Sequence, residues 1–427
     1  MTATTTTNGA HWSRKFLPIW TGQAFSIIGS QVAAFAVVWW LTQQTGSAKV
    51  LAGLTIAQLL PQVFLGPFAG AFVDRWNRRL VMIAADGIGA LLAGILALLF
   101  LSGNIQVWHI YVITFIRSLL GTFHFAAFQA STALMVPEDQ LSRVAGMNQT
   151  LWGALNIVAP PLGALALSVM PFPAIMGIDV VTAMIAVTSM LFVYIPQPER
   201  QLGAQTAFSI LTDVKEGFSY LWHWPGARLV LFGSALINAL VWPAMSLIPL
   251  LVTQHFGGGA MQLGWINSAW GIGLVAGGVT LGVWGGFKRK STTVALGLVG
   301  SAIGLLITGF APPAFFWLAF GGLLLFGFMN PIVNGPLVAI MQSAVPPDMQ
   351  GRVFATVGSV ASLAAPIGMA LAGPMADSLG VQFWFILGGI VELALVYIVI
   401  GTPALANFER GNGAVRAAPA GSAAGES

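Results

Sequence analysis

The feature that most constrains this chain is a series of twelve apolar runs, each close to the ~20 residues that a helix needs to cross a bilayer. Only 7% of the 427 residues are charged, against roughly a quarter in soluble proteins. We therefore predict an all-α membrane protein with twelve transmembrane helices. The predicted spans are 16–41, 50–73, 80–101, 108–135, 145–169, 173–195, 226–252, 262–284, 291–310, 315–342, 353–377 and 381–402.

The basic residues predict how the spans are oriented. If the N-terminus is cytoplasmic, all of the 17 Lys and Arg residues except Lys49 and Arg117 fall on the cytoplasmic side. This is the asymmetry of the positive-inside rule, and it predicts a multi-pass plasma-membrane protein with both termini in the cytoplasm. It also accounts for the pI of 9.7, so we expect contact with membrane lipid and no nucleic-acid partner.

A polar break divides the chain into two halves of six spans. Residues 136–144 (VPEDQLSRV) and 345–353 (VPPDMQGRV) are similar, so the halves are predicted to be parallel repeats. Such repeats are typical of transporters that rock one half against the other around a midplane site. We predict a cytoplasmic tail (1–15), an N-terminal bundle (16–195), a cytoplasmic linker with an amphipathic helix (196–225), a C-terminal bundle (226–402) and a disordered tail (403–427).

Charge is concentrated in the turn between the second and third spans, residues 66–79 (GPFAGAFVDRWNRR). A cluster of this kind must lie outside the hydrocarbon. The second half carries a weaker copy in which Gly286 stands in place of the acid, so only the first half keeps the carboxylate. The residues singled out here are Gly70, Asp74, Arg75, Arg78 and Arg79.

Three stretches resemble signatures of the major facilitator superfamily. GAFVDRWNRR at 70–79 resembles its signature between helices 2 and 3, 117–121 resembles its fourth-helix signature, and 159–163 resembles its helix-5 antiporter signature. Asn77, Leu120 and Ala159 depart from these patterns. Within the superfamily the strongest likeness is to the macrolide-efflux (Mef-type) proteins among the drug:proton antiporters, and it extends from Arg14 to about Pro403.

The resemblance implies a twelve-helix fold that exports hydrophobic or amphiphilic drugs, macrolide-like compounds above all, in exchange for protons. It implies no enzymatic activity, no cofactor beyond the proton gradient, and a monomer, with or without a separate partner protein. The absence of cysteine and the scattered histidines also predict no metal site. Two alternatives stay open: a siderophore or lipid exporter or flippase on the same scaffold, and a membrane sensor that binds a ligand without transport.

The resemblance further implies a conformational latch. Asp74 is expected to face the N-terminal end of the eleventh helix, just after Arg352, where the helix dipole and a cation favour a carboxylate. Arg78 or Arg79 is expected to pair with an acid at 138–139. The alternative is that the cluster is only a positive-inside signal.

Ionisable residues inside the spans are the candidates for proton coupling, because burial favours the neutral form of an acid. Asp179 ranks first and Glu392 second. Asp86 is expected to form a structural salt bridge with the basic cluster. Arg117 is expected to face an interior cavity and to adjust the pKa of a nearby carboxylate, or else to form a structural ion pair. His124 is expected to be an interior histidine with satisfied hydrogen bonds, or a proton relay.

No sharp motif identifies a substrate site. A bulky amphiphile needs a large apolar cavity with a few polar anchors. Asn330 and Pro331 also predict a break in the tenth span, because proline removes a helical hydrogen bond. The candidate cavity residues are Gln31, Gln58, Asn238, Trp242, Trp270, Asn330 and Asn334.

Overall fold

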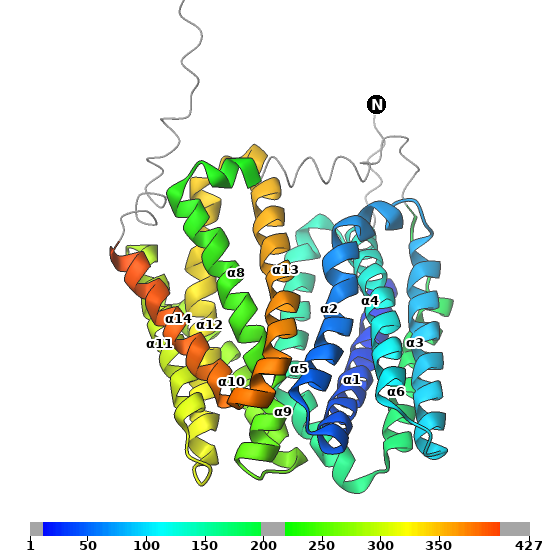
Figure 1. The fold of residues 1–427 in the computed structure, drawn as a ribbon. Coiled ribbons are helices and arrows are strands. Elements are labelled where there is room, and N and C mark those ends of the chain that lie inside the picture. The colour runs from blue at the N-terminus through cyan, green and yellow to red at the C-terminus, as the bar shows by residue number, and fades with distance from the viewer. Residues whose placement is uncertain (1–11, 198–217, 402–427) are drawn as a thin grey trace, which may run out of the picture.

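The structure is a computed structural model that describes residues 12–197 and 218–401. The described residues form helices joined by short turns (Figure 1). The first half contains α1 (Trp12–Thr45), α2 (Ala48–Val73), α3 (Arg78–Leu101), α4 (Val107–Met135), η1 (Glu138–Gln140), α5 (Leu141–Val169) and α6 (Phe172–Phe192). The second contains α8 (Pro225–Ser246), α9 (Ile248–Leu250), η2 (Leu251–His255), α10 (Ala260–Trp284), α11 (Lys290–Phe310), α12 (Phe316–Ala344), α13 (Pro347–Leu379) and α14 (Gln382–Gly401).

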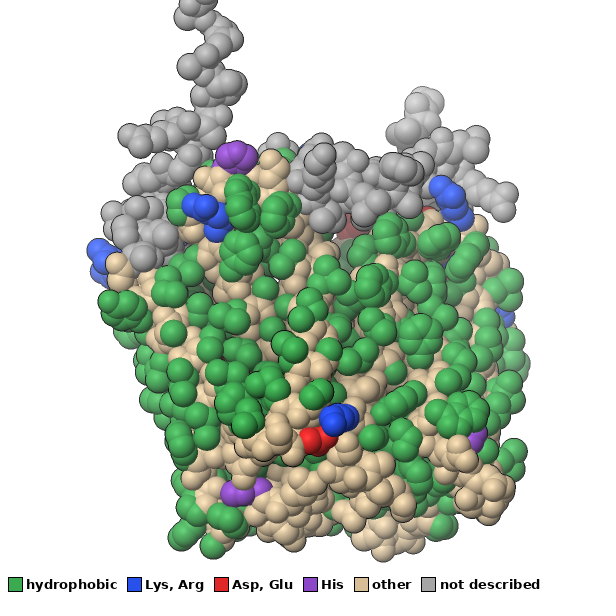
Figure 2. Space-filling view, in the orientation of Figure 1, with side chains coloured by type: hydrophobic (Ala, Val, Ile, Leu, Met, Phe, Trp, Pro, Cys, Tyr) green, Lys and Arg blue, Asp and Glu red, His purple; other side chains and the backbone are tan. Residues whose placement is uncertain are grey.

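Twelve of these helices are long and apolar enough to cross a membrane, which confirms the predicted number of spans. Figure 2 shows hydrophobic side chains covering the middle of the visible face, with most of the Lys and Arg side chains near the upper edge. An apolar belt with charge at its rim is the surface that a bilayer requires. The amphipathic helix predicted in the linker falls mainly on 198–217, and the predicted tails fall mainly on 1–11 and 402–427, so these predictions lie outside the described residues.

The helices form two bundles that lie side by side in Figure 1. In the first, α1 and α3 pack against α6, and α2 packs against α4. In the second, α11 lies between α12 and α14, and α8 packs against α13. The bundles meet through α2 with α13 and α5 with α10. The second helix of each half thus packs against the fifth of the other, as two equivalent repeats related by a twofold axis would arrange them.

The two halves are joined toward one end of the molecule. We call the end of the molecule where α1 begins and α14 ends the terminal face. The other end, which carries the turn at Gly46, is the opposite face, and the halves are joined toward it. Gln254 Nε2 donates to the Gly46 carbonyl oxygen at 2.7 Å, and Ser268 Oγ donates to the Ile157 carbonyl oxygen at 2.7 Å. An ion pair between the halves, Lys49 Nζ with Asp377 Oδ2 at 3.8 Å, is also at this face.

Gly271 allows α10 to approach α5 closely. A Cβ at this position would lie 2.7 Å from the Asn156 carbonyl oxygen, which is too close for any side chain. The helix α12 differs from its prediction, because it runs without interruption from Phe316 to Ala344 with Pro331 inside it. Neighbouring helices can accommodate proline within a membrane span, so the predicted break at this position is wrong.

Candidate functional site

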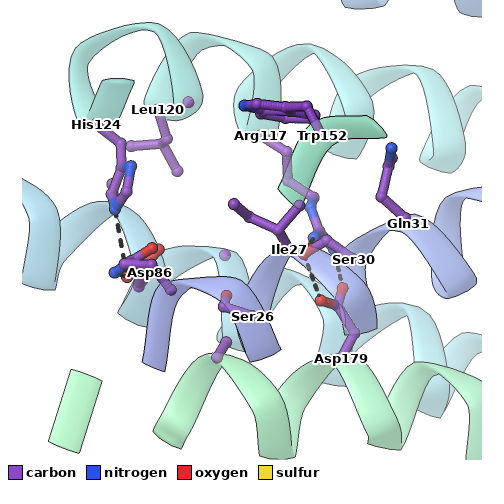
Figure 3. Close-up of a pocket in the computed structure, with 15 residues that line it drawn as sticks. Ser26, Ile27, Ser30, Gln31, Asp86, Arg117, Leu120, His124, Trp152 and Asp179 are labelled. Atoms are coloured by element: carbon purple, nitrogen blue, oxygen red, sulfur yellow. Dashed lines mark hydrogen bonds and ion pairs between the residues drawn. The ribbon is translucent and has the colours of Figure 1, made fainter. Parts of the chain in front are cut away.

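A cavity of about 210 Å³ lies inside the first half. Its walls come from α1, α3, α4, α5 and α6, and it contains four ionisable side chains: Asp86, Arg117, His124 and Asp179. Figure 3 shows them as two groups, with Asp86 and His124 on one side of Ser26, and Arg117 and Asp179 on the other. Charged groups at this depth are costly unless they are paired, and both groups are paired.

The group formed by Arg117 and Asp179 joins three helices. Arg117 Nη1, on α4, lies 2.5 Å from Asp179 Oδ2, on α6. Arg117 Nη2 donates to Ser30 Oγ at 3.1 Å, and Ser30 Oγ donates to Asp179 Oδ1 at 2.7 Å. The Asp179 side chain is 2% exposed and that of Arg117 is 26% exposed. Both oxygens of Asp179 therefore have hydrogen-bond donors, and the guanidinium reaches into the cavity.

The group formed by Asp86 and His124 also joins three helices. Gln23 Nε2, on α1, donates to Asp86 Oδ2, on α3, at 2.8 Å. His124 Nε2, on α4, lies 3.5 Å from the same oxygen. This nitrogen is buried and has no hydrogen-bond partner in the described part of the chain. The prediction of a satisfied interior histidine is therefore wrong.

The salt bridge predicted between Asp86 and the basic cluster does not form. Arg78 Nη2 donates to Asp74 Oδ1 at 2.9 Å within its own turn. Arg79 donates to two main-chain carbonyls of α6, at Met190 (2.8 Å) and Leu191 (2.6 Å). Arg78 is therefore bound in its own turn and Arg79 at the end of α6, and Asp86 faces the cavity instead.

The acid of the predicted latch, Asp74, pairs within the first half. The Asp74 side chain is 56% exposed, and its ion-pair partner is Arg78. Gly70 and Arg75 are exposed. Within 12–197 and 218–401, neither Arg78 nor Arg79 forms an ion pair with Glu138–Asp139. Arg352 lies in the second half, near the start of α13, and is partly buried.

Glu392 lies on α14, away from the cavity of the first half. Its side chain is 3% exposed, and Ser301 on α11 is its hydrogen-bond partner. The second oxygen, Oε2, has no partner among the described residues. Glu392 is thus held between two helices of the second bundle, and the structure does not bring it together with the other candidates.

A second cavity, of about 280 Å³, lies between the two halves. Helices of both bundles line it, and Gln31 lines both this cavity and the first one. Its walls are apolar with uncharged polar groups, and they contain no ionisable side chain. The polar groups that line it are Gln31, Thr55, Gln58, Asn156, Ser246 and Asn267.

Two of the seven predicted cavity residues, Gln31 and Gln58, line this second cavity. The other five do not. Asn238 and Trp242 hydrogen-bond to each other at 2.8 Å on α8, and Asn330 and Asn334 do so on α12 at 3.2 Å. Trp270 packs against the main hydrophobic core.

Three polar residues of the cavities were not predicted from the sequence: Ser30, Asn156 and Asn267. A signal for Ser30 was present, because Gln23, Ser26 and Ser30 recur at spacings of three and four and so share one face of α1. All three line the first cavity. The two asparagines carried no comparable pattern. Asn156 and Asn267 line the same cavity because α5 and α10 pack side by side.

Comparison with known proteins agrees with this architecture. The family of transmembrane secretion effectors matches residues 9–419. Macrolide efflux protein A of Streptococcus pyogenes is 32% identical over 388 residues, covering 91% of this chain and 96% of that protein. The multidrug efflux pump Tap of Mycolicibacterium fortuitum is 25% identical over 398 residues, covering 89% and 94%.

Among solved structures, a point mutant of the nucleoside transporter NupG superposes with a TM-score of 0.69 at 11% identity, covering 90% of this chain and 98% of NupG. This likeness shows a shared fold. Together with the family match, it confirms the resemblance and fold class predicted from the sequence. The chain belongs to the transmembrane secretion effector family of the major facilitator superfamily, and is a membrane transporter, not an enzyme.

Proposed function

We propose that this transporter exports hydrophobic or amphiphilic drugs, macrolide-like compounds in particular, in exchange for protons by alternating access. The observation that carries the proposal is the position of Gln31. It joins a cavity that contains ionisable groups to a cavity between the two halves that contains none. Proton binding and substrate binding therefore have separate sites that share one wall, on α1.

The cavity between the halves suits an uncharged or weakly charged amphiphile. Such ligands need mostly apolar walls with a few polar anchors, and this cavity supplies amide and hydroxyl groups within an apolar lining. Its volume of about 280 Å³ is just below the roughly 300–1,000 Å³ of pockets for drug-sized ligands. A macrolide would fit only after the halves moved apart, as alternating access requires.

The contacts between the halves support this movement. Hydrogen bonds join them toward the opposite face, whereas Asp74, the acid of the predicted latch at the terminal face, pairs with Arg78 of its own turn. We propose that this is a state closed at the opposite face, and that the pairing of Asp74 with the start of α13 belongs to the other state. In the transport cycle one set of contacts would replace the other.

We further propose that the terminal face is cytoplasmic and that the protein lies in the plasma membrane as a monomer in contact with lipid. The distribution of basic residues supports this orientation. The chain would need no cofactor, because the proton gradient would supply the energy.

The test is uptake of a radiolabelled macrolide into inside-out vesicles that contain the full chain, with and without an acid-inside pH gradient. Uptake that requires the gradient is the expected result. Folded protein that gives no macrolide uptake would contradict the proposal. The same vesicles would then be assayed with a siderophore and with a fluorescent lipid, and binding without any flux would indicate a sensor.

A further inference from the structure

The two acid–base groups in the first cavity differ in one chemical respect. Arg117 cannot lose its proton in a protein, whereas a histidine changes its charge near neutral pH. Asp179 is paired with the arginine and Asp86 with the histidine. Only the group that we call the Asp86/His124 pair consists of two residue types that can each gain or lose a proton.

The Arg117/Asp179 pair has no room for another proton. One oxygen of Asp179 contacts the guanidinium and the other accepts from Ser30. The carboxylate is 2% exposed, so water reaches it poorly. A proton could bind to Asp179 only after one of these charge-assisted contacts had opened.

The Asp86/His124 pair, in contrast, has a vacant hydrogen-bond position. His124 Nε2 is buried without a partner and lies 3.5 Å from Asp86 Oδ2. A proton placed between the two atoms would give this nitrogen its missing hydrogen bond. The side chains of His124 and Asp86 are 18% and 13% exposed and line the cavity, so they are more accessible than Asp179, which is 2% exposed.

The charge balance of the cavity leads to the same assignment. The titratable and charged groups that line it are Asp86 on α3, Arg117 and His124 on α4, and Asp179 on α6, whereas α1 and α5 contribute none. With a neutral histidine, two carboxylates face one guanidinium. One proton on the Asp86/His124 pair makes the total zero, and a net charge inside a membrane span is costly.

A connection to the substrate cavity runs along α1. Gln23 donates to Asp86, and Ser30 contacts both members of the other pair. Gln31, the next residue, reaches the cavity between the halves. Figure 3 shows Ser26 and Ile27 lying between the two pairs. A proton that changes the contact of Gln23 thus acts on the helix that also carries Gln31.

From these observations we infer that Asp86 and His124 together bind the exchanged proton, and that Arg117 and Asp179 remain ionised as a fixed counter-charge. This inference rests on the proposed proton exchange. It reverses the order predicted from the sequence, in which Asp179 ranked first.

The test uses the full chain in proteoliposomes, with two readouts for a radiolabelled macrolide. Gradient-driven accumulation requires proton exchange, whereas counterflow against unlabelled macrolide without a gradient does not. In Asp86→Asn and His124→Gln we expect at least a tenfold loss of accumulation with counterflow retained. His124→Gln keeps a polar group of similar reach, so it serves if Asp86→Asn does not fold. Glu392→Gln, a buried carboxyl group outside the cavity, should retain both activities.

A third measurement is proton release when macrolide is added to detergent-solubilised protein, followed with a pH-indicator dye. We expect release from the wild type and from Glu392→Gln, and none from Asp86→Asn or His124→Gln. If both of these variants release protons and accumulate macrolide, the inference is wrong while proton-coupled export stands. If both lose counterflow as well, the pair is structural and the inference also fails. If the wild type shows no gradient-driven accumulation, the proposed function itself fails.

Discussion

Asp377, at the end of α13 in the second half, caps the N-terminus of α2 in the first half. Its Oδ1 accepts a hydrogen bond from the backbone N–H of Ala48 at 2.9 Å. The preceding residue, Ser47, occupies the N-cap position but makes no side-chain capping hydrogen bond. A helix N-terminus favours a carboxylate through its free N–H groups and its dipole. Here the missing cap comes from the other half, so it is lost whenever the halves separate at this face.

Replacing Asp377 should therefore favour the state that is open at the opposite face. Loss of an N-cap typically costs about 1 kcal/mol, so Asp377→Ala should raise the population of this state about fivefold. The chain has no native cysteine, so Thr55→Cys in the inter-half cavity can report opening through its rate of labelling by a membrane-impermeant maleimide added at the opposite face. Lys49→Ala is the control, because the Lys49 side chain is 63% exposed and such ion pairs contribute little. Equal labelling rates in both variants would contradict the capping role.

Close packing of α10 against α5 should depend on Gly271. Gly271→Ala places a Cβ 2.7 Å from a main-chain oxygen, and we expect it to cost about 1–3 kcal/mol in thermal unfolding of the purified protein. Gly278→Ala, on the same helix, is the matched control. No atom lies within 4 Å of the added Cβ at that site, so it should be neutral or slightly stabilising. A Gly271→Ala protein as stable as the control would show that α10 is not held so closely.

The ion pair inside the first half should be necessary for folding as well as for transport. Arg117→Ala leaves the buried Asp179 carboxylate with Ser30 alone, and loss of one partner of a buried pair typically costs about 3–5 kcal/mol. The double variant Arg117→Ala with Asp179→Asn should recover much of this loss, because no unpaired charge remains. Melting temperatures of the two single variants and the double variant form a thermodynamic cycle. Additive effects would show that the two side chains do not interact.

Substrate affinity should depend on the polar groups of the inter-half cavity. Gln58→Ala removes an amide that lines it, and we expect macrolide affinity to fall about three- to tenfold, the effect of one or two hydrogen bonds. Asn334→Ala is the control, since Asn334 is exposed on α12 and lies outside the cavity. Equilibrium binding of labelled macrolide distinguishes them. Equal affinities in the two variants would place the binding site elsewhere.

Glu392 should tolerate neutralisation. The side chain is buried with Ser301 as its partner, and its other oxygen has none within the described ranges. Glu392→Gln retains the shape and the contact with Ser301 while removing the titratable group, so thermal stability should change by less than about 1 kcal/mol. A large loss of stability with intact Ser301 would indicate that the carboxylate has a partner in another state of the transporter.

The number of spans and the class of protein were predictable because a bilayer imposes its requirement on each segment separately. A helix must be about 20 apolar residues long whatever surrounds it. The likeness of 70–79 and 117–121 to superfamily signatures added the fold. Arg117 was also correctly expected to face an interior cavity, because a guanidinium at that depth has few alternatives.

The pairing of polar side chains was beyond the sequence. Asp86 lies seven residues after Arg79 on α3, and this proximity suggested a salt bridge. Arg79 binds carbonyls of α6 instead, and Asp86 faces α1 and α4. Direction around a helix, and the identity of the neighbour on that side, decide such contacts. Spacing along one helix shows that residues seven apart share a face, but it does not show which helix packs against that face.

The sequence by itself determined a twelve-span transporter, because length, hydropathy and local signatures are properties of single segments. The tertiary structure alone decided that Asp179 has its hydrogen bonds satisfied while His124 does not, and that Asp377 closes the halves at one face. The first two features depend on contacts among α1, α3, α4 and α6, and the third on the contact between α2 and α13. These helices meet only when the bundles form.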